Sequence, residues 1–132
     1  MSCPRSTAGL IRAHIGAIMH EVGIMESALG AVLAQARAHH AQRVHRIVLR
    51  IGALSGVDAD SLRFAFEALS PSTLAADATF EVVEVPVRVH CAECREDFSA
   101  SGSVIFSCPR CRRLSGDIRQ GRELELSRIE MS

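Results

Sequence analysis

The sequence has no tryptophan, tyrosine or lysine, and phenylalanine, present five times in 132 residues, is its only aromatic residue. Few aromatic side chains are therefore present to stack on nucleic-acid bases. Fifteen arginines balance fifteen acidic residues, so strong non-specific attraction to nucleic acid or to anionic lipid is not expected. No apolar run reaches the roughly 20 residues that a membrane-spanning helix needs. These absences favour a small domain with neither a membrane nor nucleic acid as its partner.

Four of the five cysteines form two Cys-x-x-Cys pairs, Cys91/Cys94 and Cys108/Cys111, with thirteen residues between the pairs. A two-residue gap lets both sulfurs of a pair turn toward one ion, and this spacing is typical of a structural zinc site. Iron bound by four thiolates is an alternative, although scarce aromatics disfavour a rubredoxin-like site. Two disulfides, or buried inert cysteines, are the alternatives without metal, and the concentration of cysteine in one pattern argues against both. A metal site of this kind fits a reducing cytoplasm.

Residues 1–18 differ from the rest of the chain. They contain Arg5 and Arg12 but no acidic residue, and their apolar run is too broken for a secretory signal. We expect this leader to be dispensable, being either disordered or included through a start codon upstream of the true one.

Hydrophobic periodicity predicts two helices and three strands after the leader. Apolar residues recur at helical spacing over about 22–39. Asp58 can cap a second helix, which ends near Pro71. Alternation of apolar and polar residues predicts strands over 43–51, 79–90 and 123–131. Pro86 interrupts the middle strand and indicates an edge or a bulge there.

The order of these elements predicts the fold class. The last strand cannot bury itself alone, so it should pair with the strand that enters the metal-binding segment or with that strand's neighbour. We expect an α+β fold in which two helices pack on a small three-stranded sheet, with an inserted four-cysteine zinc-ribbon module. Residues 19–89 and 123–132 would form the α+β domain, and residues 90–122 the zinc-binding domain.

A second candidate site is Met19-His20-Glu21, just before the first helix. If Met19 is the N-terminus, its amine, the backbone nitrogen of His20 and the imidazole can chelate one ion in adjoining rings. Nitrogen donors in a plane suit Ni(II) or Cu(II), and Glu21 can add an oxygen ligand or a hydrogen bond. If the leader is retained, the amine is lost and only His20 and Glu21 remain.

These motifs together resemble the HypA/HybF family of hydrogenase nickel-incorporation proteins, from Met19 to the C-terminus. The residues that carry the resemblance are Met19-His20-Glu21, Ile51-Gly52-Ala53-Leu54-Ser55-Gly56-Val57, Phe64-Ala65-Phe66-Glu67 and the two cysteine pairs. Family members begin at the Met-His-Glu itself, whereas eighteen residues precede it here.

The resemblance implies a nickel metallochaperone for [NiFe]-hydrogenase maturation. It implies that His20 is the main side-chain ligand of nickel, supported by the Met19 amine and Glu21. It implies a HypB-type GTPase and the hydrogenase large subunit as partners, with urease as a further recipient in some members. It also implies structural Zn(II) on Cys91, Cys94, Cys108 and Cys111.

The other histidines have ordinary interpretations. His39 and His40 end a helix, where cations suit the helix dipole, and His45 begins a strand. His90 precedes a zinc cysteine, but four thiolates already close such a site. We expect none of the four to bind metal.

The main rival is a zinc-ribbon interaction module that binds nucleic acid or a transcription or translation partner. Arg110, Arg112 and Arg113 at the second cysteine pair suggest it. However, residues 90–122 hold six arginines and four acids, a net +2 that four thiolates on Zn(II) would offset. No catalytic triad or phosphate loop is present in the sequence, so we expect no enzyme activity. We expect the protein to be a monomer or a weak homodimer.

Overall fold

The computed structural model describes residues 5–6, 21–100 and 106–132 of the chain. Two helices and seven strands lie in the described part, and the predicted order of elements is confirmed. The elements are β1 (Arg5–Ser6), α1 (Glu21–Ala38), β2 (Val44–Gly52), α2 (Ala59–Leu69), β3 (Thr79–Val85), β4 (Val87–Cys91), β5 (Glu96–Ala100), β6 (Ile118–Gln120) and β7 (Leu124–Met131).

The first sheet has the strand order β1-β7-β2-β3, in which β2 pairs parallel with β3 and antiparallel with β7. The last strand therefore pairs with the neighbour of the strand that enters the metal-binding segment, one of the two predicted arrangements. Side chains alternate along β2, so Leu49 is buried in the core. On the opposite face, Arg46 contacts Glu81 at 2.5 Å and Arg50 contacts Glu125 at 3.0 Å.

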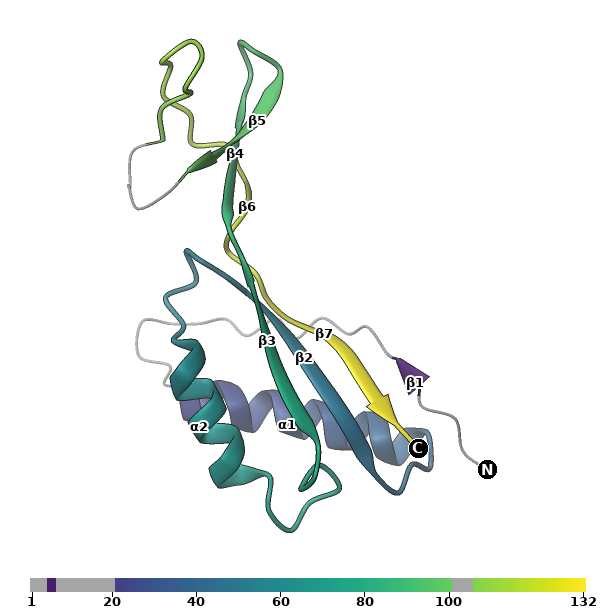
Figure 1. Cartoon of the computed structure of the whole chain (residues 1–132). Helices are drawn as coiled ribbons and strands as arrows, with labels where there is room; N and C mark the ends of the chain where they lie inside the picture. The colour runs from purple at the N-terminus through teal and green to yellow at the C-terminus, as the bar shows by residue number, and fades with distance from the viewer. Residues whose placement is uncertain (1–4, 7–20, 101–105) are drawn as a thin grey trace.

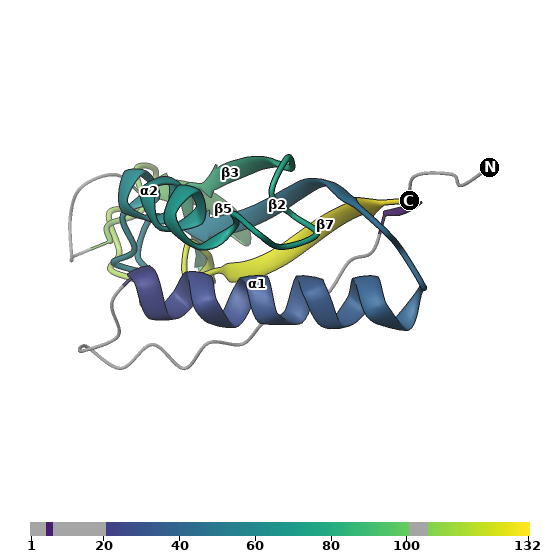
Figure 2. The same ribbon diagram turned by 90° about the horizontal axis from the view of Figure 1, so that it is seen from below.

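Both helices supply the core of this α+β domain. Helix α1 runs along one face of the sheet, and α2 packs beside it on the β3 side (Figures 1 and 2). The carboxylate of Asp58 caps α2 as predicted, accepting a hydrogen bond from the Ser61 amide at 3.0 Å. Phe66 of α2 stacks on Phe80 of β3, with ring centroids 5.1 Å apart. The predicted two-layer packing of helices on a sheet is confirmed.

Pro86 marks the passage from the first sheet to the second. Because proline has no N–H to donate, it ends the pairing of β3 before the chain continues as β4. The second sheet has the order β5-β4-β6. We call residues 87–120 the cysteine module; it projects from the α+β domain in Figure 1. Its sheet begins at Val87, slightly before the domain boundary that the sequence predicts at residue 90.

The loop after β2 contacts both chain segments that join the two sheets. The Ala53 amide donates to the Val85 carbonyl at 2.9 Å, and the Leu54 amide donates to the Gly121 carbonyl at 2.6 Å. A Cβ on Gly52 would lie 2.1 Å from the backbone of Gly121, which itself has φ of +124°. Only glycine fits this close backbone approach at position 52.

Arg5 and Ser6 of the leader form β1, which pairs antiparallel with the end of β7. This short strand extends the three predicted strands of the sheet by a fourth. The rest of the leader lies outside the described residues, so its disorder or origin in a misplaced start codon stays a prediction. Neither described helix combines the length and the hydrophobicity needed to cross a membrane.

Candidate metal centre

The four predicted zinc cysteines come together at the tip of the cysteine module. Their Sγ atoms all lie within 4.8 Å of one another. Cys91 and Cys111 are separated by 3.5 Å between sulfurs, and Cys94 and Cys108 by 3.9 Å. Four sulfurs bound tetrahedrally at about 2.3 Å from a zinc ion would lie about 3.8 Å apart. None of the four is in a disulfide in this structure, and the donor set fits a tetrahedral metal.

The two Cys-x-x-Cys turns share one backbone design. The residue after each pair is an arginine with positive φ, 56° at Arg95 and 65° at Arg112. This conformation is uncommon for residues other than glycine. In the second turn the Arg112 amide donates to the Cys108 carbonyl at 2.9 Å. The turns are therefore tight enough to aim both sulfurs of a pair at one point.

Backbone dipoles and crowding set the acidity of the sulfurs. The backbone N–H groups of Cys111 and Arg110 favour a thiolate at Cys108 and lower its pKa to about 6. Contacts with the neighbouring sulfurs, that of Cys111 foremost, and burial raise the pKa of Cys94 to about 12. Thiols that share one small volume compete in this way, because each thiolate disfavours the next. A divalent ion supplies the positive charge that lets all four ionise.

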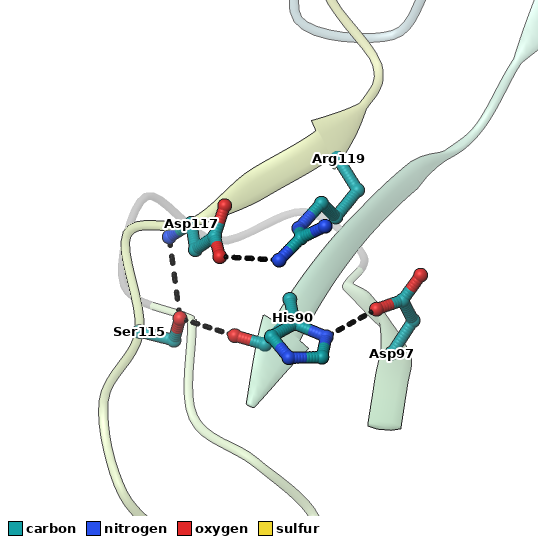
Figure 3. A network of polar contacts seen from close by, with 5 residues as sticks. All are labelled: His90, Asp97, Ser115, Asp117 and Arg119. Atoms are coloured by element: carbon teal, nitrogen blue, oxygen red, sulfur yellow. Dashed lines mark hydrogen bonds and ion pairs between the residues drawn. The ribbon is translucent and has the colours of Figure 1, made fainter. Parts of the chain in front are cut away.

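A polar network braces the strand that leads into the first cysteine pair (Figure 3). Nδ1 of His90 lies 2.7 Å from the Asp97 carboxylate on the neighbouring strand, and because a carboxylate only accepts, Nδ1 is the donor. The Ser115 hydroxyl donates to the His90 carbonyl at 2.6 Å, and the His90 amide donates to the Asp117 carbonyl at 2.8 Å. His90 thus ties β4 to the chain after the second pair, as a neighbour of the cysteines.

Several arginines of the module are paired with acids. Arg110 contacts Glu96, and this contact raises the pKa of the arginine. Arg119 lies 2.9 Å from Asp117, a contact that Figure 3 also shows. These ion pairs partly neutralise the positive charge of the module. The structure therefore offers little support for the rival nucleic-acid interpretation.

The predicted nickel segment is described only in part. Met19 and His20 lie outside the described residues. Glu21 begins α1, and its Oε2 accepts a hydrogen bond from the Asp58 amide at 3.0 Å. This contact places Glu21 beside the capped start of α2. No sequence pattern signals it, since the two residues are separated by 37 positions.

The converging group of cysteines does not include His39, His40 or His45. His39 and His40 are exposed after the end of α1, and Nε2 of His45 contacts the Ser132 hydroxyl. Across residues 5–6, 21–100 and 106–132, the four cysteines are the only group of three or more potential ligands whose donor atoms converge.

Comparison with known sequences identifies close relatives. Residues 19–131 match the family described as hydrogenase/urease nickel incorporation, metallochaperone, hypA. The hydrogenase maturation factor HypA of Picosynechococcus sp. strain PCC 7002 is 39% identical over 113 residues, which cover 86% of this chain and 99% of that protein. The HypA of Chloroflexus aurantiacus strain J-10-fl is 40% identical over 112 residues, covering 85% of this chain and 98% of the relative.

Comparison with solved structures also identifies HypA proteins. The solution structure of the nickel metallochaperone HypA from Helicobacter pylori aligns with a TM-score of 0.59 at 28% identity. A second solution structure of a HypA protein aligns with a TM-score of 0.63 at 27% identity. Each alignment covers 86% of this chain and 97% of the solved chain.

Proposed function

The chain belongs to the HypA family of hydrogenase/urease nickel-incorporation metallochaperones, and from this membership we propose that it binds Ni(II) at Met19-His20-Glu21 and delivers it during maturation of [NiFe]-hydrogenase. The observation that carries the proposal is the family match itself, which begins at Met19. Urease is a second candidate recipient, in keeping with the family description.

His20 is the main side-chain ligand in this proposal, with the Met19 amine completing the chelate when Met19 is the N-terminus. Glu21 can act either as a ligand of the metal ion or as a hydrogen-bond partner of another ligand. Its carboxylate is partly exposed and accepts one hydrogen bond from Asp58, which leaves lone pairs free for a metal ion or for a ligand of that ion.

Delivery by ligand exchange suits a site at the surface. An incoming protein can replace ligands one at a time at the exposed start of a helix, whereas a buried cage would hold the ion. The amine must be deprotonated and the imidazole neutral for binding, so nickel affinity falls in mild acid.

The four cysteines hold structural Zn(II) in this proposal, and their closed ligand set leaves no position for a substrate. The protein is accordingly a carrier and not an enzyme. It works in the cytoplasm with a HypB-type GTPase, which supplies nucleotide hydrolysis, and with the hydrogenase large subunit. The chain itself acts as a monomer or weak homodimer.

Calorimetric titration with Ni(II) tests the nickel site. Protein that starts at Met19 should bind about one equivalent, and the H20A variant should bind none at that site. H39A is the matched control, because His39 is an exposed histidine at the other end of α1, and it should bind nickel like the parent. Unchanged nickel affinity in H20A would refute the site assignment.

The intact mass of the protein from its native host tests the starting residue. A mass that corresponds to a Met19 start supports the amine ligand. An active protein that retains residues 1–18 would exclude it.

A further inference from the structure

A solvent-open cavity of about 500 Å³ lies between the first turn of α1 and the first half of α2. Its walls are Glu21 and Val22 from α1 and Asp60, Ser61 and Phe64 from α2. The cavity thus joins the end of the proposed nickel segment to the outer face of the second helix.

The apolar residues of this cavity are not part of the hydrophobic core. Phe64 is 72% exposed and Val22 is 49% exposed. The buried stripe of α2 contains Leu62 and Phe66, so Phe64 points away from the core, on the same side as Asp60, one turn earlier. Phenylalanine is enriched where proteins bind other proteins.

The rim of the cavity is acidic. Glu21 and Asp60 carry carboxylates on opposite helices, and Asp58 lies beside Glu21. Arg63 pairs with Asp60 at 2.7 Å, yet the Asp60 side chain remains 90% exposed. An acidic partner would be repelled here, whereas arginine or lysine side chains on a partner would be attracted.

We propose that this cavity receives a large apolar side chain, flanked by arginine or lysine, on the hydrogenase large-subunit precursor that accepts nickel. The inference rests on the proposed function. Glu21 lines the cavity and directly follows His20 in the sequence, so the proposed nickel segment ends at the docking site. Docking there turns ligand exchange between two proteins into an effectively intramolecular step.

The cavity is the centre of the interface and not its full extent. Stable protein interfaces bury about 800 Å² on each partner, far more than one or two side chains in a cavity can provide. Aromatic residues in desolvated central pockets carry a large share of binding energy. Phe64 is the residue placed to do so here.

Binding of the full chain to the purified large-subunit precursor, measured by biolayer interferometry, tests the proposal. F64A should weaken the dissociation constant at least tenfold. L114A is the matched control, because Leu114 is 71% exposed but lies in the cysteine module, and it should stay within twofold of the parent. Since neither side chain is buried, both variants should keep the parent melting temperature.

The contribution of the acidic rim is tested through the association rate and its dependence on salt. D60N should slow association two- to fivefold at low salt, and the difference should shrink at high salt because screening removes long-range attraction. A D60N association rate equal to that of the parent at low salt would refute the role of the rim.

The outcomes separate docking from nickel binding. Equal affinity of F64A and the parent for the precursor overturns the proposal, and so does a parent protein that does not bind the precursor. If F64A instead impairs binding of a GTPase partner or self-association, the occupant is wrong. Nickel titration of F64A should match the parent. Failure of the parent to bind nickel refutes the proposed function while leaving a Phe64-dependent interface standing.

Discussion

Among the residues that the structure describes, the α+β domain buries eighteen in one continuous core, whereas the core of the cysteine module contains five, two of which are the candidate metal ligands Cys91 and Cys108. The remaining three are Val87, Val89 and Phe98. The first region resembles an ordinary small domain, in which apolar burial contributes about 25 cal/mol per Å². The second is too small to be held by burial alone.

The two regions are therefore expected to be stabilised by different interactions. A structural zinc ion contributes about 10–16 kcal/mol of apparent binding free energy in small zinc-finger peptides. That is as large as the whole net stability of a typical domain, about 5–15 kcal/mol. We therefore expect the fold of the module to depend on a metal bound by its four cysteines, and the fold of the α+β domain to depend on its helices and sheet.

Metal removal should unfold the cysteine module and leave the α+β domain folded. Chelation of zinc, or the C108S substitution, should remove amide exchange protection from β4, β5 and β6 because the cysteine sulfurs then repel or lose their common partner. Protection of β2 at the centre of the other sheet should persist. Hydrogen-exchange mass spectrometry reads both regions in one experiment, and elemental analysis should fall from about one zinc per chain to none.

The exposed control for C108S is S107A, which changes the neighbouring residue and leaves all four sulfurs in place. It should keep its zinc. Simultaneous loss of protection in β2 and β4 on chelation would show that the two regions fold as one unit.

Sequence patterns are sufficient for the parts of the structure that repeat or are spaced regularly. The Cys-x-x-Cys pairs predict the converging sulfurs, and the alternation in β2 predicts which face carries Arg46 and Arg50. Asp58 is recognisable as a helix cap because that role depends on neighbouring residues.

Contacts between distant segments carry no such signal. The bond from Asp58 to Glu21, the packing of Gly52 on Gly121 and the cavity beside Phe64 each depend on how separate elements meet. Periodicity places Phe64 outside the buried stripe, but it does not reveal which helix lies next to it. Tertiary packing decides such contacts, and one sequence does not encode them in a local pattern.

The junction between the two regions gives a smaller expected effect. In G52A the new Cβ would lie 2.1 Å from the backbone of Gly121, so the two segments must move apart and the bond from Leu54 to Gly121 should weaken. We expect a loss of about 1–3 kcal/mol in unfolding free energy, as for other overpacked sites. Zinc content should not change, because the cysteines lie beyond the junction. Urea denaturation and elemental analysis measure the two quantities.

Gly30 offers the matched glycine control. It lies in α1, where an added Cβ would meet no heavy atom within 4 Å, and it is exposed. G30A should stabilise the α+β domain by about 0.5–1 kcal/mol, since alanine is the better helix former. Equal effects of G52A and G30A would mean that the junction tolerates a methyl group and does not fix how the regions join.

The smallest expected effect concerns charge at the start of α2, within the α+β domain alone. Hydrogen bonds from the Ser61 hydroxyl and amide lower the pKa of Asp58 below its ordinary value of 3.8. A lowered folded-state pKa means that the carboxylate stabilises the fold fully above the unfolded pKa, and that this stabilisation disappears as the pH falls through the folded pKa. D58N keeps a good capping residue but cannot titrate. Its stability relative to the parent should therefore improve as the pH is lowered from about 5 to about 2.5. Both proteins lose the metal of the cysteine module in acid, so the difference between their urea midpoints isolates the cap. A pH-independent difference would show that Asp58 contributes no charge-dependent stability. Packing of the helices on the sheet would then account for the stability of the α+β domain without a contribution from charge at the start of α2.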